Sequence, residues 1–160
     1  MKGNDGTGNV VDRDDWQTPT KLFDSLDRQY EFNFDCCASE ENSKCVVWQD
    51  DFLIVKNKLI HEVAWMNPPF SKCFEMFDHF FKVVEKGVAI YRCDNMETKV
   101  WQDIILKHAT WVLIPKGRIS YEGKEGKGSR FPSALIGFNV SIPENVEGAI
   151  LKNILDGEVL

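Results

Sequence analysis

The sequence lacks a long apolar run, a paired cysteine pattern and an excess of basic residues. No hydrophobic stretch reaches the roughly 20 residues that a membrane-spanning helix needs, so we expect no membrane partner. The five cysteines are an odd number without a CxxC pair, and the three histidines stand apart, which argues against a disulfide framework and a zinc site. The polar N-terminus shows no apolar core of a secretion signal. We therefore expect a cytoplasmic protein with reduced thiols and no metal.

The chain has 19 basic and 25 acidic residues, for a net charge of −6. This balance argues against a protein whose entire surface attracts nucleic acid. Residues 116–130 are a local exception, since five basic side chains there outnumber two acidic ones and four glycines interrupt the chain. This composition predicts a loop that reaches phosphates or base edges, with an ordinary solvated loop as the alternative. The basic residues are Lys116, Arg118, Lys124, Lys127 and Arg130.

A length of 160 residues suits one domain, and the order of the apolar segments favours an α/β fold. Short strand-like runs alternate with helical periodicities in the first two thirds, and the last third is rich in strands. We expect a compact single sheet whose C-terminal strands are antiparallel. The polar, glycine-containing residues 1–15 predict a flexible tail, and residues 16–160 predict the folded domain.

Local patterns give sharper expectations. Thr18-Pro19 is typical of a helix start, with Thr18 as the N-cap and Pro19 as the first helical residue. Ser71 is a candidate cap for a second helix, which would bury an aromatic stripe beginning at Phe74 and end at Gly87.

Three later segments are expected to be irregular or short. Residues 122–130 should form a long loop between two strands, because glycine and charge dominate them. Residues 144–160 predict a short helix or a frayed tail. Asp94-Asn95 follows a predicted strand and is equally consistent with a pocket lining and with a plain turn.

The tetrapeptide Asn67-Pro68-Pro69-Phe70 is the most informative motif. It directly follows the apolar residues 63–66, so it should lie at the carboxyl end of a strand, where open α/β sheets bind ligands. The two prolines remove two backbone N–H groups and stiffen the turn. The Asn67 side-chain oxygen and the Pro68 carbonyl then offer paired acceptors to a planar exocyclic amine, and Phe70 can stack on its ring. Two such acceptors make the nitrogen lone pair available as a nucleophile.

The alternative interpretation of this motif is a plain Pro-Pro turn followed by a core phenylalanine. At average composition, a small polar residue, two prolines and an aromatic arise together in about one chain of this length in a few hundred. The position straight after a buried strand makes chance rarer still. We therefore favour the functional interpretation.

Further segments stand around this motif in a characteristic order. They are Trp16-Gln17-Thr18-Pro19, Phe34-Asp35-Cys36-Cys37-Ala38, Asn42-Ser43-Lys44-Cys45, Lys116-Gly117-Arg118-Ile119 and Phe131-Pro132-Ser133-Ala134. NPPF is similar to the (Asn/Asp/Ser)-Pro-Pro-(aromatic) motif of amino-methyltransferases that use S-adenosylmethionine. The order over residues 16–140 resembles that of phage-type DNA adenine methyltransferases of the Dam type. This resemblance implies a class I, Rossmann-like methyltransferase sheet and methylation of adenine in DNA.

The resemblance also implies roles for individual residues. Asn67, Pro68, Pro69 and Phe70 would grip and stack a flipped adenine of duplex DNA. S-adenosyl-L-methionine would be the cofactor, and the residues that correspond to its binding motifs are Trp16, Gln17, Thr18, Pro19, Asp35, Ala38 and Asp51. The chain departs from the usual pattern, because no glycine occurs between Gly8 and Gly87 and Cys36-Cys37-Ala38-Ser39 stands where a glycine-rich loop is common. A phage-encoded relative would act in the host cytoplasm, beside restriction–modification systems.

Other functions stay open at this point. The same fold and motif would suit an RNA or a protein glutamine amide, whose nitrogen is also planar. A protein without catalysis is the third alternative, either as a cofactor-binding protein or as an antirestriction factor that mimics DNA. The basic residues 116–130 favour nucleic acid over protein, and they argue against a DNA mimic.

Overall fold

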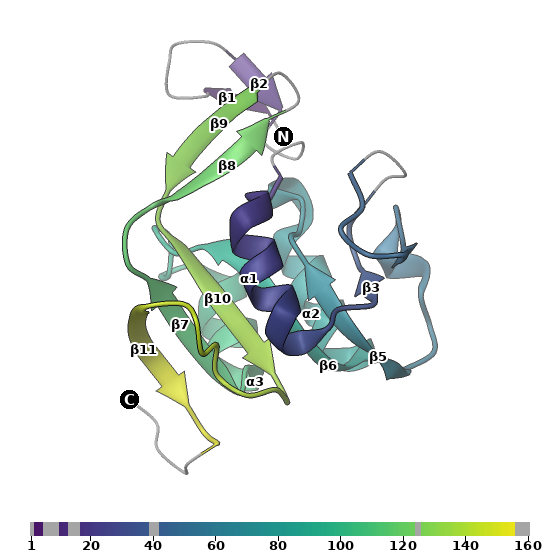
Figure 1. Ribbon diagram of the computed structural model, residues 1–160. Coiled ribbons are helices and arrows are strands. Elements are labelled where there is room, and N and C mark those ends of the chain that lie inside the picture. The colour runs from purple at the N-terminus through teal and green to yellow at the C-terminus, as the bar shows by residue number, and fades with distance from the viewer. Residues whose placement is uncertain (1, 5–9, 13–16, 39–41, 124–125, 156–160) are drawn as a thin grey trace.

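A seven-stranded sheet with the order β11-β7-β10-β6-β5-β3-β4 forms the centre of the computed structural model (Figure 1). The structure describes residues 2–4, 10–12, 17–38, 42–123 and 126–155, and the side chains of 17–38, 42–121 and 131–155. The strands of the sheet are β3 (Phe34–Asp35), β4 (Val47–Trp48), β5 (Leu59–Met66), β6 (Val84–Arg92), β7 (Trp111–Pro115), β10 (Ser133–Phe138) and β11 (Gly148–Asn153).

The strand directions are parallel on one side of the sheet and antiparallel on the other. β4, β3, β5 and β6 run parallel to one another. β10 is inserted antiparallel between β6 and β7, and β11 pairs antiparallel with the outer side of β7. This order confirms the expected Rossmann-like methyltransferase sheet with antiparallel C-terminal strands.

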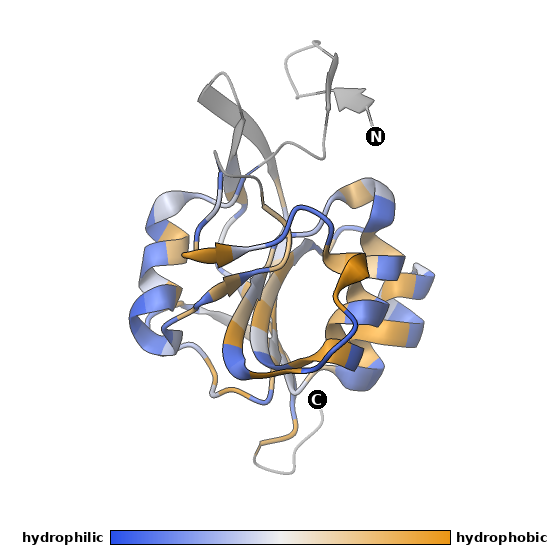
Figure 2. Cartoon of the chain, turned by 90° about the vertical axis from the view of Figure 1, so that its right-hand side faces the viewer, coloured by the Kyte–Doolittle hydropathy of each residue, from blue (hydrophilic) through white to orange (hydrophobic). Residues whose placement is uncertain are grey.

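Helices cover both faces of the sheet, so the structure has three layers (Figure 2). α1 (Thr20–Tyr30) lies on one face, and α2 (Cys73–Val83), η4 (Val100–Ile105) and α3 (Leu106–His108) lie on the other. α1 buries Phe23 and Leu26 at helical spacing, and Phe23 packs edge-on against Trp65 of β5, with ring centroids 5.4 Å apart. None of the described helices has the length and apolar character to cross a membrane.

The two predicted helix starts are each displaced. Pro19 has extended backbone angles and is the N-cap of α1, so Thr18 stands before the helix and does not cap it. A short 3-10 turn, η3 (Phe70–Lys72), precedes α2 and takes up the position where Ser71 was expected to cap. The buried stripe of α2 is Met76, Phe77, Phe80 and Val83, so Phe74 lies beside it and is 41% exposed.

Gly87 lies inside β6 and does not end α2. The helix ends at Val83, because Val84 adopts extended angles and begins the buried strand. A Cβ at Gly87 would lie 2.7 Å from the Ala64 carbonyl oxygen on neighbouring β5. The glycine therefore permits close strand pairing, which its sequence position alone did not reveal.

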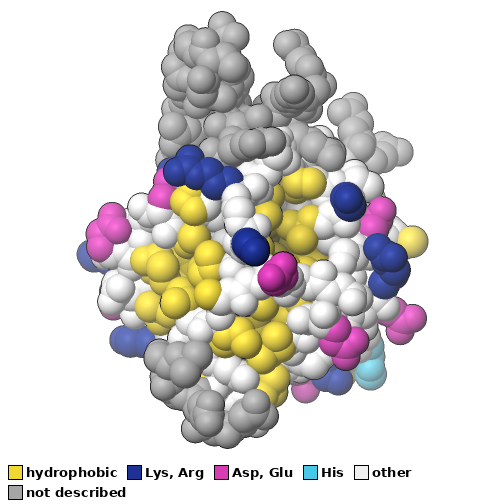
Figure 3. Space-filling model, turned by 60° about the vertical axis from the view of Figure 1, so that its left-hand side comes forward, with side chains coloured by type: hydrophobic (Ala, Val, Ile, Leu, Met, Phe, Trp, Pro, Cys, Tyr) yellow, Lys and Arg dark blue, Asp and Glu magenta, His cyan; other side chains and the backbone are white. Residues whose placement is uncertain are grey.

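The C-terminal third holds more strand than expected. β8 (Ile119–Gly123) and β9 (Gly126–Phe131) pair as an antiparallel hairpin, so most of the predicted loop 122–130 is strand. Residues 148–153 form β11, so the expected short helix or tail is wrong there. β11 forms one of the two edges of the sheet, and it exposes the apolar side chains of Ile150 and Leu151. Figure 3 shows a face of the molecule on which apolar side chains lie next to basic and acidic ones.

The N-terminal residues that the structure describes form two short strands. β1 (Lys2–Asn4) pairs antiparallel with β2 (Val10–Asp12). The predicted boundary between a tail and a domain at residue 16 stays a prediction.

Candidate active site at the carboxyl edge of the sheet

The parallel strands end at one edge of the sheet and bring the predicted site segments together. The register pairs Asp35 of β3 with Trp65 of β5 and with Trp48 of β4, and Met66 of β5 with Ala89 of β6. The residues that follow these strand ends therefore meet at the same edge, which is the ligand-binding edge of open α/β sheets. They are residues 36–38, 49–51, 67–70 and 93–95, and Arg92 is the last residue of β6.

Asn67 is joined to the N-terminal motif by a side-chain hydrogen bond. Its amide Nδ2 donates to the Thr18 hydroxyl at 3.1 Å, and Thr18 is buried. The two residues are 49 positions apart in the chain. This bond holds the amide nitrogen towards Thr18, so the fold itself sets the orientation of the Asn67 side chain.

The proline pair holds an extended turn that leads into η3. Pro68 is buried, and Pro69 has φ −62° and ψ 134°. The Pro69 carbonyl accepts the hydrogen bond from the Lys72 backbone N–H at 3.1 Å, which closes η3. The turn thus uses the carbonyl of the second proline for its own structure, whereas the predicted acceptor is the carbonyl of the first.

Phe70 packs within a cluster of aromatic side chains. Its ring meets Tyr91 of β6 at 5.9 Å and Phe131 of β9 at 5.4 Å between centroids, both in edge-to-face geometry. The Arg92 guanidinium carbon lies over the Phe70 ring, 5.5 Å from its centroid. Phe70 is only 7% exposed, so its ring is held in one orientation by its neighbours.

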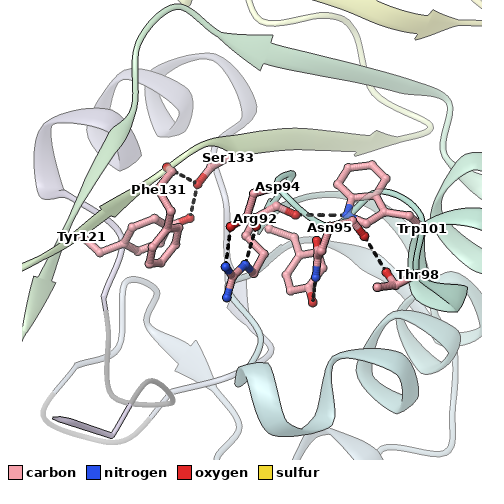
Figure 4. Close-up of polar contacts among 9 residues, drawn as sticks. Arg92, Asp94, Asn95, Thr98, Trp101, Tyr121, Phe131 and Ser133 are labelled. Carbon is pink, nitrogen blue, oxygen red and sulfur yellow. Dashed lines mark hydrogen bonds and ion pairs between the residues drawn. The ribbon is translucent and has the colours of Figure 1, made fainter. Parts of the chain in front are cut away.

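Arg92 is itself held by a carboxylate (Figure 4). Its Nε donates to Asp94 Oδ1 at 2.6 Å, and its terminal nitrogen Nη2 donates to Asp94 Oδ2. This bidentate pair lowers the pKa of the Asp94 carboxyl and raises that of Arg92. The Trp101 indole N–H also donates to the Arg92 carbonyl at 3.0 Å, which fixes the backbone of the same residue.

Asp35 organises the turn that follows β3. Its carboxylate accepts hydrogen bonds from the backbone N–H groups of Cys37, at 3.2 Å, and Lys44, at 3.0 Å. Asp35 is 2% exposed, and burial raises its pKa to about 6 against the opposing effect of these bonds. Burial also raises the pKa of the Cys36 and Cys37 thiols well above the ordinary value, so both stay neutral small residues.

Asp35 gives a testable pH dependence of stability. Its folded-state pKa of about 6 exceeds the ordinary 3.8, so its contribution is fully present below pH 3.8 and is lost as the pH rises through about 6. Between pH 4 and pH 7, the free energy of unfolding of the wild type should fall by about 3 kcal/mol more than that of Asp35→Asn. The measurement is urea unfolding at each pH. The control is Asp24→Asn at an exposed position of α1. Parallel curves for wild type and Asp35→Asn would contradict the assignment.

The other residues predicted for the cofactor differ in their surroundings. Gln17 and Pro19 are half-buried, and Ala38 is buried with its backbone N–H donating to the Gln49 carbonyl at 2.9 Å. Asp51 is exposed, directly before η2 (Phe52–Ile54) at the carboxyl edge. Trp16 lies outside the described residues.

Two of the predicted basic residues lie beside the start of α1. Lys116 and Arg118, both exposed, line an open cleft of about 520 Å³ together with Pro19 and Lys21. The structure thus places Pro19, predicted for the cofactor, beside two residues predicted for DNA. The Lys116 ammonium lies 3.9 Å from the Glu147 carboxylate, and at these exposures that pair is screened by solvent. Lys124 and the side chains of Lys127 and Arg130 lie outside the described residues.

Comparison with known proteins decides the family. The model of the family "DNA N-6-adenine-methyltransferase (Dam)" matches residues 6–140 of the chain. The chain belongs to the Dam family. The matched range covers the sheet from β3 to β10 and all four segments at its carboxyl edge. No curated protein matches the chain.

Membership of the Dam family confirms the recognition based on motif order, and it indicates a DNA adenine methyltransferase. The structure adds residues to the candidate site that sequence reasoning missed, namely Tyr91, Arg92 and Phe131 around Phe70. One signal for Arg92 was available, because a basic residue directly after the apolar residues 88–91 is unusual for a strand that is otherwise buried. Phe131 begins one of the segments that carry the resemblance, but its contact with Phe70 could not be predicted, because it joins segments far apart in the chain.

Proposed function

We propose that this member of the Dam family transfers a methyl group from S-adenosyl-L-methionine to the exocyclic amino group of adenine in DNA, at the NPPF turn. The observation that best supports this function is the hydrogen bond between Asn67 and Thr18. It joins the turn predicted to hold the target amine to the motif predicted to hold the methyl donor.

In this proposal Asn67 and Pro68 are the acceptors for the two amine hydrogens. Thr18 occupies the amide nitrogen of Asn67, so the amide oxygen is the end directed at the amine. A neutral amide suits this role, because a carboxylate there would stabilise the cationic donor before transfer and thus favour the ground state. The main contribution of these residues is orientation, with the reacting atoms about 3–3.5 Å apart.

The residues at the carboxyl edge fit the proposed methyl donor. Cys36, Cys37 and Ala38 have small side chains that permit close approach where other members of the fold class have glycine. The exposed Asp51 carboxylate would accept hydrogen bonds from ribose hydroxyls. Asp35 fixes the backbone at Cys37 and Lys44 by accepting a hydrogen bond from the N–H group of each. When bound, S-adenosyl-L-methionine would supply an electrophilic methyl group on its sulfonium.

An adenine inside a duplex cannot reach a turn at the edge of a sheet. The proposal therefore includes rotation of the base out of the stack, which costs a few kcal/mol. Phe70 would receive its face, with the ring held in place by Tyr91 and Phe131.

The test of the proposed function is nucleoside analysis of DNA from a methylation-deficient host that expresses the chain. N6-methyladenine should appear in host DNA, and tritium from labelled S-adenosylmethionine should enter unmethylated DNA in vitro. Transfer into RNA or into protein glutamine instead would support those alternatives. Cofactor binding without transfer to any of these substrates would support a protein that has lost catalysis.

The proposed contact of Lys116 and Arg118 with DNA predicts a smaller salt dependence in a double variant. We expect Lys116→Met with Arg118→Met to reduce the slope of log K against log salt concentration by about 1 to 2, because each lost phosphate contact removes about 0.9. Binding is measured by fluorescence anisotropy with duplex DNA. The matched control is Lys82→Met with Lys86→Met, two exposed lysines on α2 and β6. An unchanged slope would remove this surface from the proposed interface.

A further inference from the structure

Arg92 lies between two aromatic rings that belong to different parts of the proposed machinery. Its guanidinium carbon is 5.5 Å from the centroid of Phe70, in the NPPF turn, and 5.4 Å from the centroid of Phe131, at the end of the β8–β9 hairpin. Both distances are within the range of cation–π attraction. The two rings also contact each other at 5.4 Å. A single charged side chain therefore joins the turn to the hairpin.

The base of the hairpin is firmly anchored where it meets this contact. Phe131 stacks on Tyr121 of β8, with ring centroids 4.6 Å apart and an interplanar angle of 29°. Tyr121 is 1% exposed, and its hydroxyl forms a 2.8 Å hydrogen bond with the Ser133 hydroxyl at the start of β10 (Figure 4). Because this end of the hairpin is closely packed, a displacement of the hairpin would move Phe131 and would change the packing around Phe70.

The chemistry at this position suits arginine in particular. The planar guanidinium lies over the aromatic rings while its fork of N–H groups is held by Asp94 on two oxygens. Lysine has no planar fork, and an apolar residue has neither the charge nor the clamp. The Arg92 side chain is 21% exposed, so its guanidinium stands at the rim of the site and not in the core, where a hydrophobic residue would be sufficient.

We propose that Arg92, clamped by Asp94, is a positioning residue that couples the β8–β9 hairpin to the Phe70 platform, so that DNA held by the hairpin presents its target base to an aligned ring. This inference rests on the proposed function. It assigns no contact between Arg92 and the base, because the guanidinium acts through Phe70 and Phe131. The hairpin would set the position of the DNA, and Arg92 would transmit that position to the turn.

The experiment compares Arg92→Met, Arg92→Lys and Asp94→Asn with the control Lys82→Met, which breaks the exposed ion pair with Asp78 on α2. We expect Arg92→Met to lower kcat for methyl transfer into unmethylated DNA by about 10-fold or more, because misalignment of reacting groups mainly slows the chemical step. The KM for S-adenosylmethionine should stay within about twofold of wild type in this variant, since positioning is separate from cofactor binding. Arg92→Lys and Asp94→Asn should fall between Arg92→Met and wild type.

Hydrogen exchange on the full chain provides a second measurement that does not depend on activity. Arg92→Met should raise amide exchange in peptides covering residues 67–72 and in those covering 119–131, while Lys82→Met changes neither. Increased exchange in one segment alone would overturn the coupling. A loss of kcat no larger than that of Lys82→Met, or a loss explained by cofactor KM, would overturn the positioning role. If the wild-type chain transfers no methyl group, the proposed function fails and the exchange result still decides the coupling.

Discussion

Replacing Asn67 by alanine is expected to lower kcat for methyl transfer into DNA by at least about 10²-fold, which is the usual loss when one preorganised dipole is removed from a transition state. The side chain is half-buried at the end of β5, and its orientation is set by the Thr18 hydroxyl. Alanine removes the acceptor for one amine hydrogen and leaves the rigid proline pair in place. Affinity for S-adenosylmethionine, measured by isothermal titration, should stay within about threefold, because this side chain addresses the target amine.

Two further variants sharpen this result. Asn57→Ala, at an exposed loop position, is the matched control and should keep full activity. Thr18→Val preserves shape but removes the hydroxyl that accepts from Asn67. We expect Thr18→Val to lower kcat by less than Asn67→Ala does, because the amide is still present but is no longer oriented. Wild-type kcat in Asn67→Ala would show that the NPPF turn is structural and would end the proposed mechanism.

Gly137→Ala is expected to destabilise the fold by about 3 kcal/mol or more, at the upper end of what overpacking a core costs. Gly137 lies in β10, paired with Val88 of β6 and with Trp111 of β7. A Cβ there would lie 1.9 Å from a ring carbon of Trp111. That indole cannot move aside easily, because it is fully buried and its N–H donates to the Val140 carbonyl at 2.8 Å.

The measurement is urea unfolding followed by circular dichroism, with Gly117→Ala as the comparison. Gly117 has φ 86° and no atom within 4 Å of its would-be Cβ, so alanine there meets backbone strain without overlap. Its cost should be about 1 kcal/mol, the usual penalty for a left-handed residue with a side chain. An equal effect of the two substitutions would mean that strand pairing around Trp111 is looser than the structure shows.

Some local predictions failed because sequence patterns do not contain tertiary packing. The residues of α2 have helical periodicity, but packing against the sheet decides which stripe is buried, so Phe80 lies in the core and Phe74 is exposed. Residues 148–153 have no strong strand signal, and they form β11 because β7 offers an open edge. Such pairing depends on a partner more than 30 positions away, which no local pattern specifies.

The sequence by itself determined the chemistry-bearing turn and the class of fold. Two consecutive prolines after an apolar run must produce a rigid turn at a strand end, and the order of the surrounding motifs is enough to indicate the Dam family. The physical reason is that these features depend on residues adjacent in the chain.

Only the tertiary structure decided which residues meet at that turn. Thr18 reaches Asn67 because α1 and β5 pack together, and Phe131 reaches Phe70 because β10 returns antiparallel beside β6. Arg92 joins both rings only once these segments are in place. Contacts between distant segments arise from the burial of shared apolar surface, and that surface exists only in the folded chain.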